Sequence, residues 1–279
     1  MAYRSLLTIL TDRNIARRTL EHAIALSKTL DAHLDALCLG VDRTQTSYFY
    51  EGANAIIIQE SLAQARTELV ENAGFARGLL ERSEIRWSMD EQLTQIADLN
   101  RQVAQKARFS DLVLLPRPYG EDRGGELEVA VEAAMFEGDA PVLVVPDQGA
   151  FPPVPERIMV AWNESAEAMT AIRRALPFLK AAQTVHIAII GPPERRIERS
   201  EPGSMLGQML ARHGVNCTID VLGKTRPQVS DILNRHAMDT GAEMIVMGAY
   251  GHSRFREAIL GGATRNMLEA AKVPVFMAR

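Results

Sequence analysis

The sequence predicts two tandem α/β domains, each built on a doubly wound parallel sheet. Short apolar runs alternate with amphipathic stretches along the chain, as they do where strands alternate with helices. The runs LVLLP at 112–116 and MIVMG at 244–248 are apolar on both faces, which is typical of parallel strands covered by helices on both sides. Segments of the first half also recur in the second.

The repeat is clearest around the fourth predicted strand of each half. SDLVLLPRPYG at 110–120 resembles AEMIVMGAYGH at 242–252, and each is followed by a helix-like stretch and a terminal strand. Between the halves, DQGAFPPVPE at 147–156 contains three prolines and no apolar periodicity, which is typical of a linker. We therefore expect two domains of similar plan, at 1–148 and 156–279.

In the first half, five strands should alternate with four helices. The helix around 91–108 illustrates the signal, because Ile96, Leu99, Val103 and Ala107 recur at spacings of three and four and form one apolar stripe. The expected strands are 4–11, 33–41, 84–89, 111–116 and 141–146, and the expected helices are 14–30, 53–80, 91–108 and 125–138.

The second half follows the same order. Ala168, Ile172, Ala175 and Leu179 form the apolar stripe of its first helix. The expected strands are 157–162, 184–190, 216–221, 243–248 and 273–278, and the expected helices are 165–180, 203–213, 226–240 and 254–271.

Composition excludes several classes of protein. A net charge of −4 leaves no basic footprint for nucleic acid. No apolar run is long enough to span a bilayer, and Ser5–Leu10 is too short for the core of a signal peptide, so we expect a cytoplasmic protein. Cys38 and Cys217 stand far apart inside strand-like stretches, which indicates reduced thiols, and no zinc-ligand spacing occurs.

Four glycines surround the last helix, at Gly248, Gly251, Gly261 and Gly262. The sequence has neither a Walker A loop nor a GxGxxG motif after a first strand. The spacing of the glycines is G-x2-G-x9-G, and in this pattern the chain resembles the universal stress protein family. The resemblance covers nearly the whole chain as two tandem copies. It implies Rossmann-like, five-stranded parallel sheets of order 3-2-1-4-5 that pair as a homodimer or an intramolecular pseudo-dimer.

In that family the glycine pattern binds the triphosphate of ATP, so the resemblance implies ATP, with or without Mg²⁺, as the ligand. Glycines allow the backbone to approach a phosphate closely, and N–H groups at a helix start attract anions. Asn163 stands where the family often has an aspartate, and Ile190 and Gly191 match the region where adenine rests. The implied nucleotide-binding residues are Ala161, Trp162, Asn163, Ile190, Gly191, Gly248, Gly251, His252, Gly261, Gly262, Ala263 and Thr264.

Two departures from the family pattern matter. The family's ATP binders usually have Ser or Thr where this chain has Gly262, and the missing hydroxyl should cost about 1.5–3 kcal/mol of binding energy. In the first half the motif is replaced by PRPYGEDRGGELEVA at 116–130, where prolines remove N–H donors and carboxylates repel phosphate. Asp12 remains at the end of the first strand, but we expect that this half has lost its nucleotide site.

Two function classes stay open, with a third as the minimal alternative. The first is a nucleotide-binding protein with a regulatory or stress-response role, and no catalytic constellation surrounds the motif. The second is a slow ATPase or a nucleotidyl- or phosphoryl-transferring enzyme, because the same fold supports such reactions. The third is a scaffold that has lost nucleotide binding.

Overall fold

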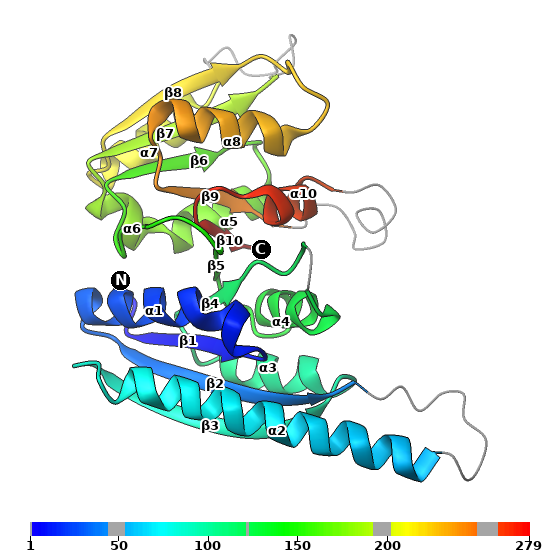
Figure 1. Ribbon diagram of the computed structural model, residues 1–279. Coiled ribbons are helices and arrows are strands. Elements are labelled where there is room, and N and C mark those ends of the chain that lie inside the picture. The colour runs from blue at the N-terminus through cyan, green and yellow to red at the C-terminus, as the bar shows by residue number, and fades with distance from the viewer. Residues whose placement is uncertain (1, 44–53, 121–122, 192–201, 250–261) are drawn as a thin grey trace. The chain divides into compact units, whose positions relative to one another are not determined.

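A computed structural model describes residues 2–43, 54–120, 123–191, 202–249 and 262–279 of the chain (Figure 1). Strands and helices alternate through these residues, which confirms the α/β class. No helix within the described ranges is long and apolar enough to cross a membrane. The chain divides into two compact units, Tyr3–Ala140 and Pro141–Arg279.

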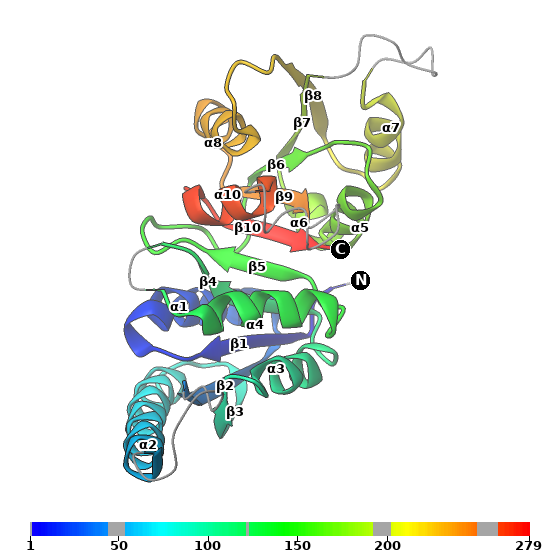
Figure 2. The ribbon, with the colours of Figure 1, turned by 90° about the vertical axis from the view of Figure 1, so that its right-hand side faces the viewer.

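In the N-terminal unit, parallel strands run in the order β3-β2-β1-β4. Helices α1 and α2 pack together on this sheet, and α3 and α4 form a second packed pair (Figure 2). The elements are β1 (Ser5–Leu10), α1 (Arg13–Leu30), β2 (His33–Asp42), α2 (Asn54–Leu80), β3 (Arg86–Gln95), α3 (Leu99–Ala107), β4 (Leu112–Pro116) and α4 (Gly125–Phe136).

In the C-terminal unit, the order β8-β7-β6-β9-β10 is entirely parallel. This is the expected 3-2-1-4-5 order, and it is confirmed for this half. The elements are β5 (Val142–Val145), β6 (Arg157–Ala161), α5 (Ala166–Arg174), α6 (Leu176–Ala181), β7 (Thr184–Ile190), α7 (Ser204–Arg212), β8 (Cys217–Leu222), α8 (Val229–Thr240), β9 (Met244–Gly248), α10 (Ala263–Ala270) and β10 (Val275–Ala278).

Strand β5 pairs with the last strand of the C-terminal half. The structure groups β5 with the C-terminal unit, where it runs antiparallel to β10. Val144 lies opposite Val275 and Leu143 opposite Phe276, all of them buried. Strand β5 thereby satisfies the backbone groups along the open side of β10. The order 3-2-1-4 is confirmed for the first half, and the assignment of β5 to it as a fifth parallel strand stays a prediction.

Two helix boundaries also differ from the prediction. Residues 91–95 belong to β3 and not to a helix, because β3 pairs with β2 along its whole length up to Gln95. The helix expected at 165–180 is interrupted at Ala175, because Pro177 lies in the first turn of the following helix α6 and cannot continue the hydrogen bonds of α5.

The last predicted helix, 254–271, is described only in part. The described part of it starts at Ala263, and Gly262 has extended backbone instead of the expected helical one. The residues from 254 to 261 lie outside the described ranges.

Helix α2 packs very closely on β2 at Gly40. A Cβ placed on Gly40 would lie 2.8 Å from the Cβ of Leu69, and it would also collide with the carbonyl oxygen of Ala65. Since that oxygen belongs to the helix backbone, the contact leaves little room to relax. Gly74 lies in the same helix, and a Cβ there would meet nothing within 4 Å.

Two glycine-to-alanine variants test this contact. Gly40→Ala should lower the free energy of unfolding by about 1–3 kcal/mol because it overpacks the β2–α2 interface. Gly74→Ala should instead raise it by about 0.5–1 kcal/mol, since alanine is the better helix former. Urea denaturation of both variants measures the difference, and equal stabilities would contradict the packing described here.

Candidate functional site

The candidate site lies at the carboxyl ends of β6 and β9. Strand β6 pairs with β7 on one side and with β9 on the other, so that Ala161 lies opposite both Ala188 and Met247. The strand order reverses at this point, and open parallel sheets bind ligands in the crevice formed there. The structure therefore brings the end of β6 and the beginning of the glycine pattern to adjacent positions.

The segment after β6 turns sharply into helix α5. The backbone N–H of Trp162 donates to the Ala188 carbonyl at 2.9 Å, which extends the ladder by one residue. Asn163 is exposed, and its Oδ1 accepts from the Ser165 N–H at 3.2 Å. Its Nδ2 group has no partner within the described part of the chain and can donate to a ligand.

Glu164 has a left-handed backbone with φ of 64°. Such a conformation is unusual for a residue with a side chain, and it often accompanies functional loops. The sequence carried no signal for this strain. Ser165 then caps α5, because its Oγ accepts from the Ala168 N–H at 3.1 Å.

The predicted adenine region lies at the end of β7. Ile190 is half-buried, and the Gly191 N–H donates to the Leu222 carbonyl at 2.9 Å. Gly191 has φ of +53°, while a Cβ there would approach only the Cβ of Lys224, at 3.5 Å. Glycine is thus favoured here by backbone conformation and not by lack of space.

Gly248 has a structural role that the sequence did not reveal. A Cβ at this position would lie 2.7 Å from the carbonyl carbon of Glu167 and 2.9 Å from the Cα of Ala168. The first turn of α5 therefore rests directly on the end of β9. This contact requires glycine whether or not a phosphate binds.

The second part of the glycine pattern leads into α10. Gly262 is the residue before this helix and offers no capping side chain to the first N–H groups. Ala263 is exposed, whereas Thr264 is only 3% exposed and packs inward. The N-terminus of a helix carries a partial positive charge that favours an anion. Gly251, His252 and Gly261 lie outside the described residues.

In the N-terminal unit, charged side chains of the protein itself lie at the corresponding edge of the sheet. Asp12 caps α1, because its Oδ1 accepts from the Asn14 N–H at 2.7 Å. Glu126 in the first turn of α4 is 5% exposed and pairs with Arg43 at 2.6 Å. Arg43 also contacts Glu68 at 3.0 Å. The hydrogen bond to Glu126 raises the pKa of Arg43 above its ordinary value.

A second polar cluster ties α8 to the sheet. His186 Nδ1 and His236 Nε2 lie 3.0 Å and 2.8 Å from the same oxygen of Asp220. The carboxylate of Asp220 thus contacts both imidazole rings and connects β7, β8 and α8. Within the described ranges, no three His, Cys, Asp or Glu side chains are placed to hold a metal ion.

The family model and the curated relative that match this chain are both described as universal stress proteins. The family model described as "Universal stress protein family" matches residues 155–279. Universal stress protein Slr1230 of Synechocystis is 24% identical over 156 residues, which are 56% of this chain and 52% of that protein. The match therefore spans about half the length of that relative.

Two solved structures share the fold over almost the whole chain. A universal stress protein of Archaeoglobus fulgidus superimposes with a TM-score of 0.72 at 15% identity, over 99% of this chain and 96% of that one. A functionally unknown protein of Pseudomonas aeruginosa PAO1 gives 0.57 at 14% identity, over 99% and 92%. Residues 155–279, the C-terminal half of this chain, thus match the universal stress protein family, and the strand order observed there is consistent with that match.

Proposed function

We propose that this protein binds ATP in its C-terminal half and acts as a cytoplasmic regulatory or stress-response protein. One observation carries the proposal: the G-x2-G-x9-G pattern starts at the last residue of β9, beside the point where the strand order reverses, and ends directly before α10. In the universal stress protein family this pattern holds the triphosphate.

Local chemistry supports a phosphate at this place. Gly262, the residue before α10, has no side chain that could cap the helix, and the partial positive charge of a helix N-terminus favours an anion. The start of α5 is held against Gly248 and points a second helix N-terminus toward the same strand end. The Asn163 amide adds a neutral donor for the base or the ribose.

The two halves should differ in nucleotide binding, so that each chain binds one nucleotide, in its C-terminal half. In the N-terminal unit the first turn of α4 already carries the buried carboxylate of Glu126, paired with Arg43. A phosphate at that helix start would meet this negative charge and would have to displace the ion pair. Pairing of the two halves with each other, or of two chains, stays a prediction from the sequence.

Valine substitutions at Gly251 and Gly261 test the backbone cradle. If backbone N–H groups hold the phosphates, a branched side chain at either position should abolish ATP binding in calorimetry. Gly223→Val is the matched control, because it lies in a loop of the same unit where a Cβ would meet only Thr225, at 3.6 Å. Gly248 is unsuitable, since its substitution disturbs α5. Unchanged ATP affinity in both motif variants would mean that the glycines only allow the chain to turn and hold no phosphate.

Restoring the family's residue should strengthen the site. Gly262→Ser adds a hydroxyl at the start of α10, and one charge-assisted hydrogen bond to a phosphate should tighten ATP binding by about tenfold. Calorimetry on the variant and the original protein measures the ratio. Weaker or unchanged binding, with circular dichroism showing an intact fold, would mean that no phosphate lies beside this position.

A further inference from the structure

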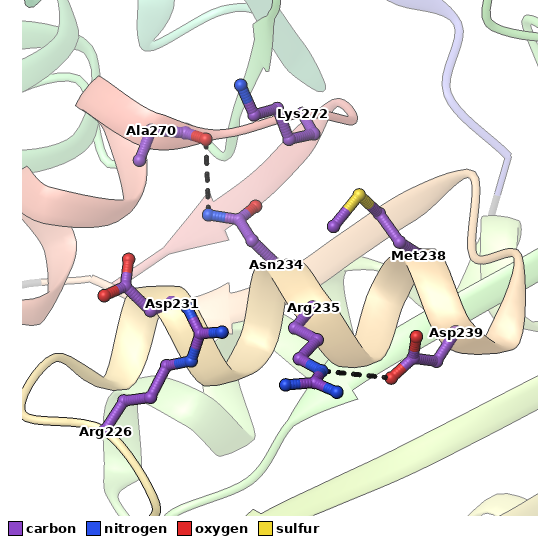
Figure 3. Close-up of a pocket in the computed structure, with 8 residues that line it drawn as sticks. All are labelled: Arg226, Asp231, Asn234, Arg235, Met238, Asp239, Ala270 and Lys272. Carbon is purple, nitrogen blue, oxygen red and sulfur yellow. Dashed lines mark hydrogen bonds and ion pairs between the residues drawn. The ribbon is translucent and has the colours of Figure 1, made fainter.

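A pocket of about 410 Å³ lies along α8, beside the end of α10 (Figure 3). Its lining includes Arg226, Asn234, Met238 and Lys272. It lies at the opposite end of α10 from Gly262, so it is separate from the proposed nucleotide site. Pockets of this volume are large enough for a small ligand or the end of a peptide.

Asn234 gives this pocket an unfilled hydrogen-bond acceptor. The residue is 7% exposed, and its Nδ2 donates to the Ala270 carbonyl at 3.3 Å. Because that carbonyl can only accept, the amide nitrogen must face it and Oδ1 must turn away. Oδ1 is buried and has no hydrogen-bond partner among the described residues. Buried acceptors are normally paired, so a missing donor is the simplest explanation.

The fold itself does not require this arrangement, as the N-terminal unit shows. There the corresponding carbonyl, of Glu137, accepts from Nη2 of the exposed Arg108 at 3.0 Å. Helices α3 and α4 also approach so closely that a Cβ on Gly138 would lie 2.7 Å from that of Ala107. Within the described residues, Oδ1 of Asn100 and Oε1 of Gln102 on α3 are also buried without a hydrogen-bond partner. What distinguishes Asn234 is that its amide reaches the Ala270 carbonyl and lines a pocket.

The groups around the acceptor indicate what the donor belongs to. Asn234 Oδ1 points toward the side of the pocket where Lys272 and Met238 lie (Figure 3). Lys272 is exposed and forms no ion pair within the described part of the chain, and Met238 is 62% exposed. Arg235, by contrast, is engaged by Asp239 at 3.8 Å. A cation, a hydrogen-bond acceptor and an apolar surface thus adjoin one another.

We propose that this pocket binds the C-terminus of a peptide that ends in an apolar residue. The terminal carboxylate pairs with Lys272, the N–H of the same residue donates to Asn234 Oδ1, and its side chain covers Met238. Because Oδ1 is buried, the pocket has to widen at Asn234 for the N–H of the ligand to reach it. Arg226 supplies a second positive charge, and Asp231 disfavours a ligand with several carboxylates.

A short peptide series tests the ligand chemistry. The probes are acetyl-Ala-Ala-Leu with a free carboxylate, the same peptide with a C-terminal amide, and N-acetyl-leucine. Calorimetry on the full chain should show binding of the free acid and binding at least about tenfold weaker for the amide. Equal affinity for acid and amide would overturn the proposal, as would no binding of the acid at millimolar concentration. Equal affinity for N-acetyl-leucine would replace the peptide with a free acyl amino acid.

Charge-reversal variants locate the site. Lys272→Glu should weaken binding of the free acid by about fivefold or more, whereas Lys180→Glu, an equal charge change on α6, should alter it less than about twofold. Equal effects of the two variants would contradict the assignment. Asn234→Ala should also weaken binding in protein that circular dichroism shows to be folded. ATP titrations of Lys272→Glu should match those of the original protein, so failure here leaves the nucleotide proposal unaffected.

Discussion

The contact between the first turn of α5 and the last residue of β9 organises the C-terminal half. Because Gly248 has no side chain, the backbone at Glu167 and Ala168 rests directly on the strand end. The parallel pairing of β6 with β9 places Ala161 beside this contact. A helix N-terminus, two strand ends and the start of the glycine pattern are consequently held together at the edge where a doubly wound sheet binds its ligands.

The two halves use the corresponding edge differently. In the N-terminal unit the anion at the start of α4 is the protein's own carboxylate, Glu126, and Arg43 neutralises it. In the C-terminal unit Gly262 precedes α10 and has no side chain that could cap the helix. The proposed phosphate would supply the negative charge at this helix N-terminus that Glu126 supplies in the other half.

Local patterns predicted most of the elements, because parallel strands buried on both faces and amphipathic helices leave clear periodicity. The strand order of the C-terminal half came from the resemblance to the family. The predictions failed where the length of an element depends on residues far away in the sequence. Strand β3 extends to Gln95 because β2 continues beside it. The sequence placed Gly248 in a candidate site but gave no sign of its contact with α5. The hydrogen bond from Asn234 to the Ala270 carbonyl also depends on a residue far away in the sequence and has no local signal.

Native mass spectrometry of freshly purified full-length protein tests the central claim most directly. With ATP in excess, we expect one bound nucleotide for each chain, and Gly251→Val should remove it. That result would agree with a phosphate at the start of α10 and with the Glu126–Arg43 ion pair at the start of α4. Two nucleotides for each chain would contradict the asymmetry of the halves, and no bound nucleotide at saturating ATP would contradict the nucleotide site itself.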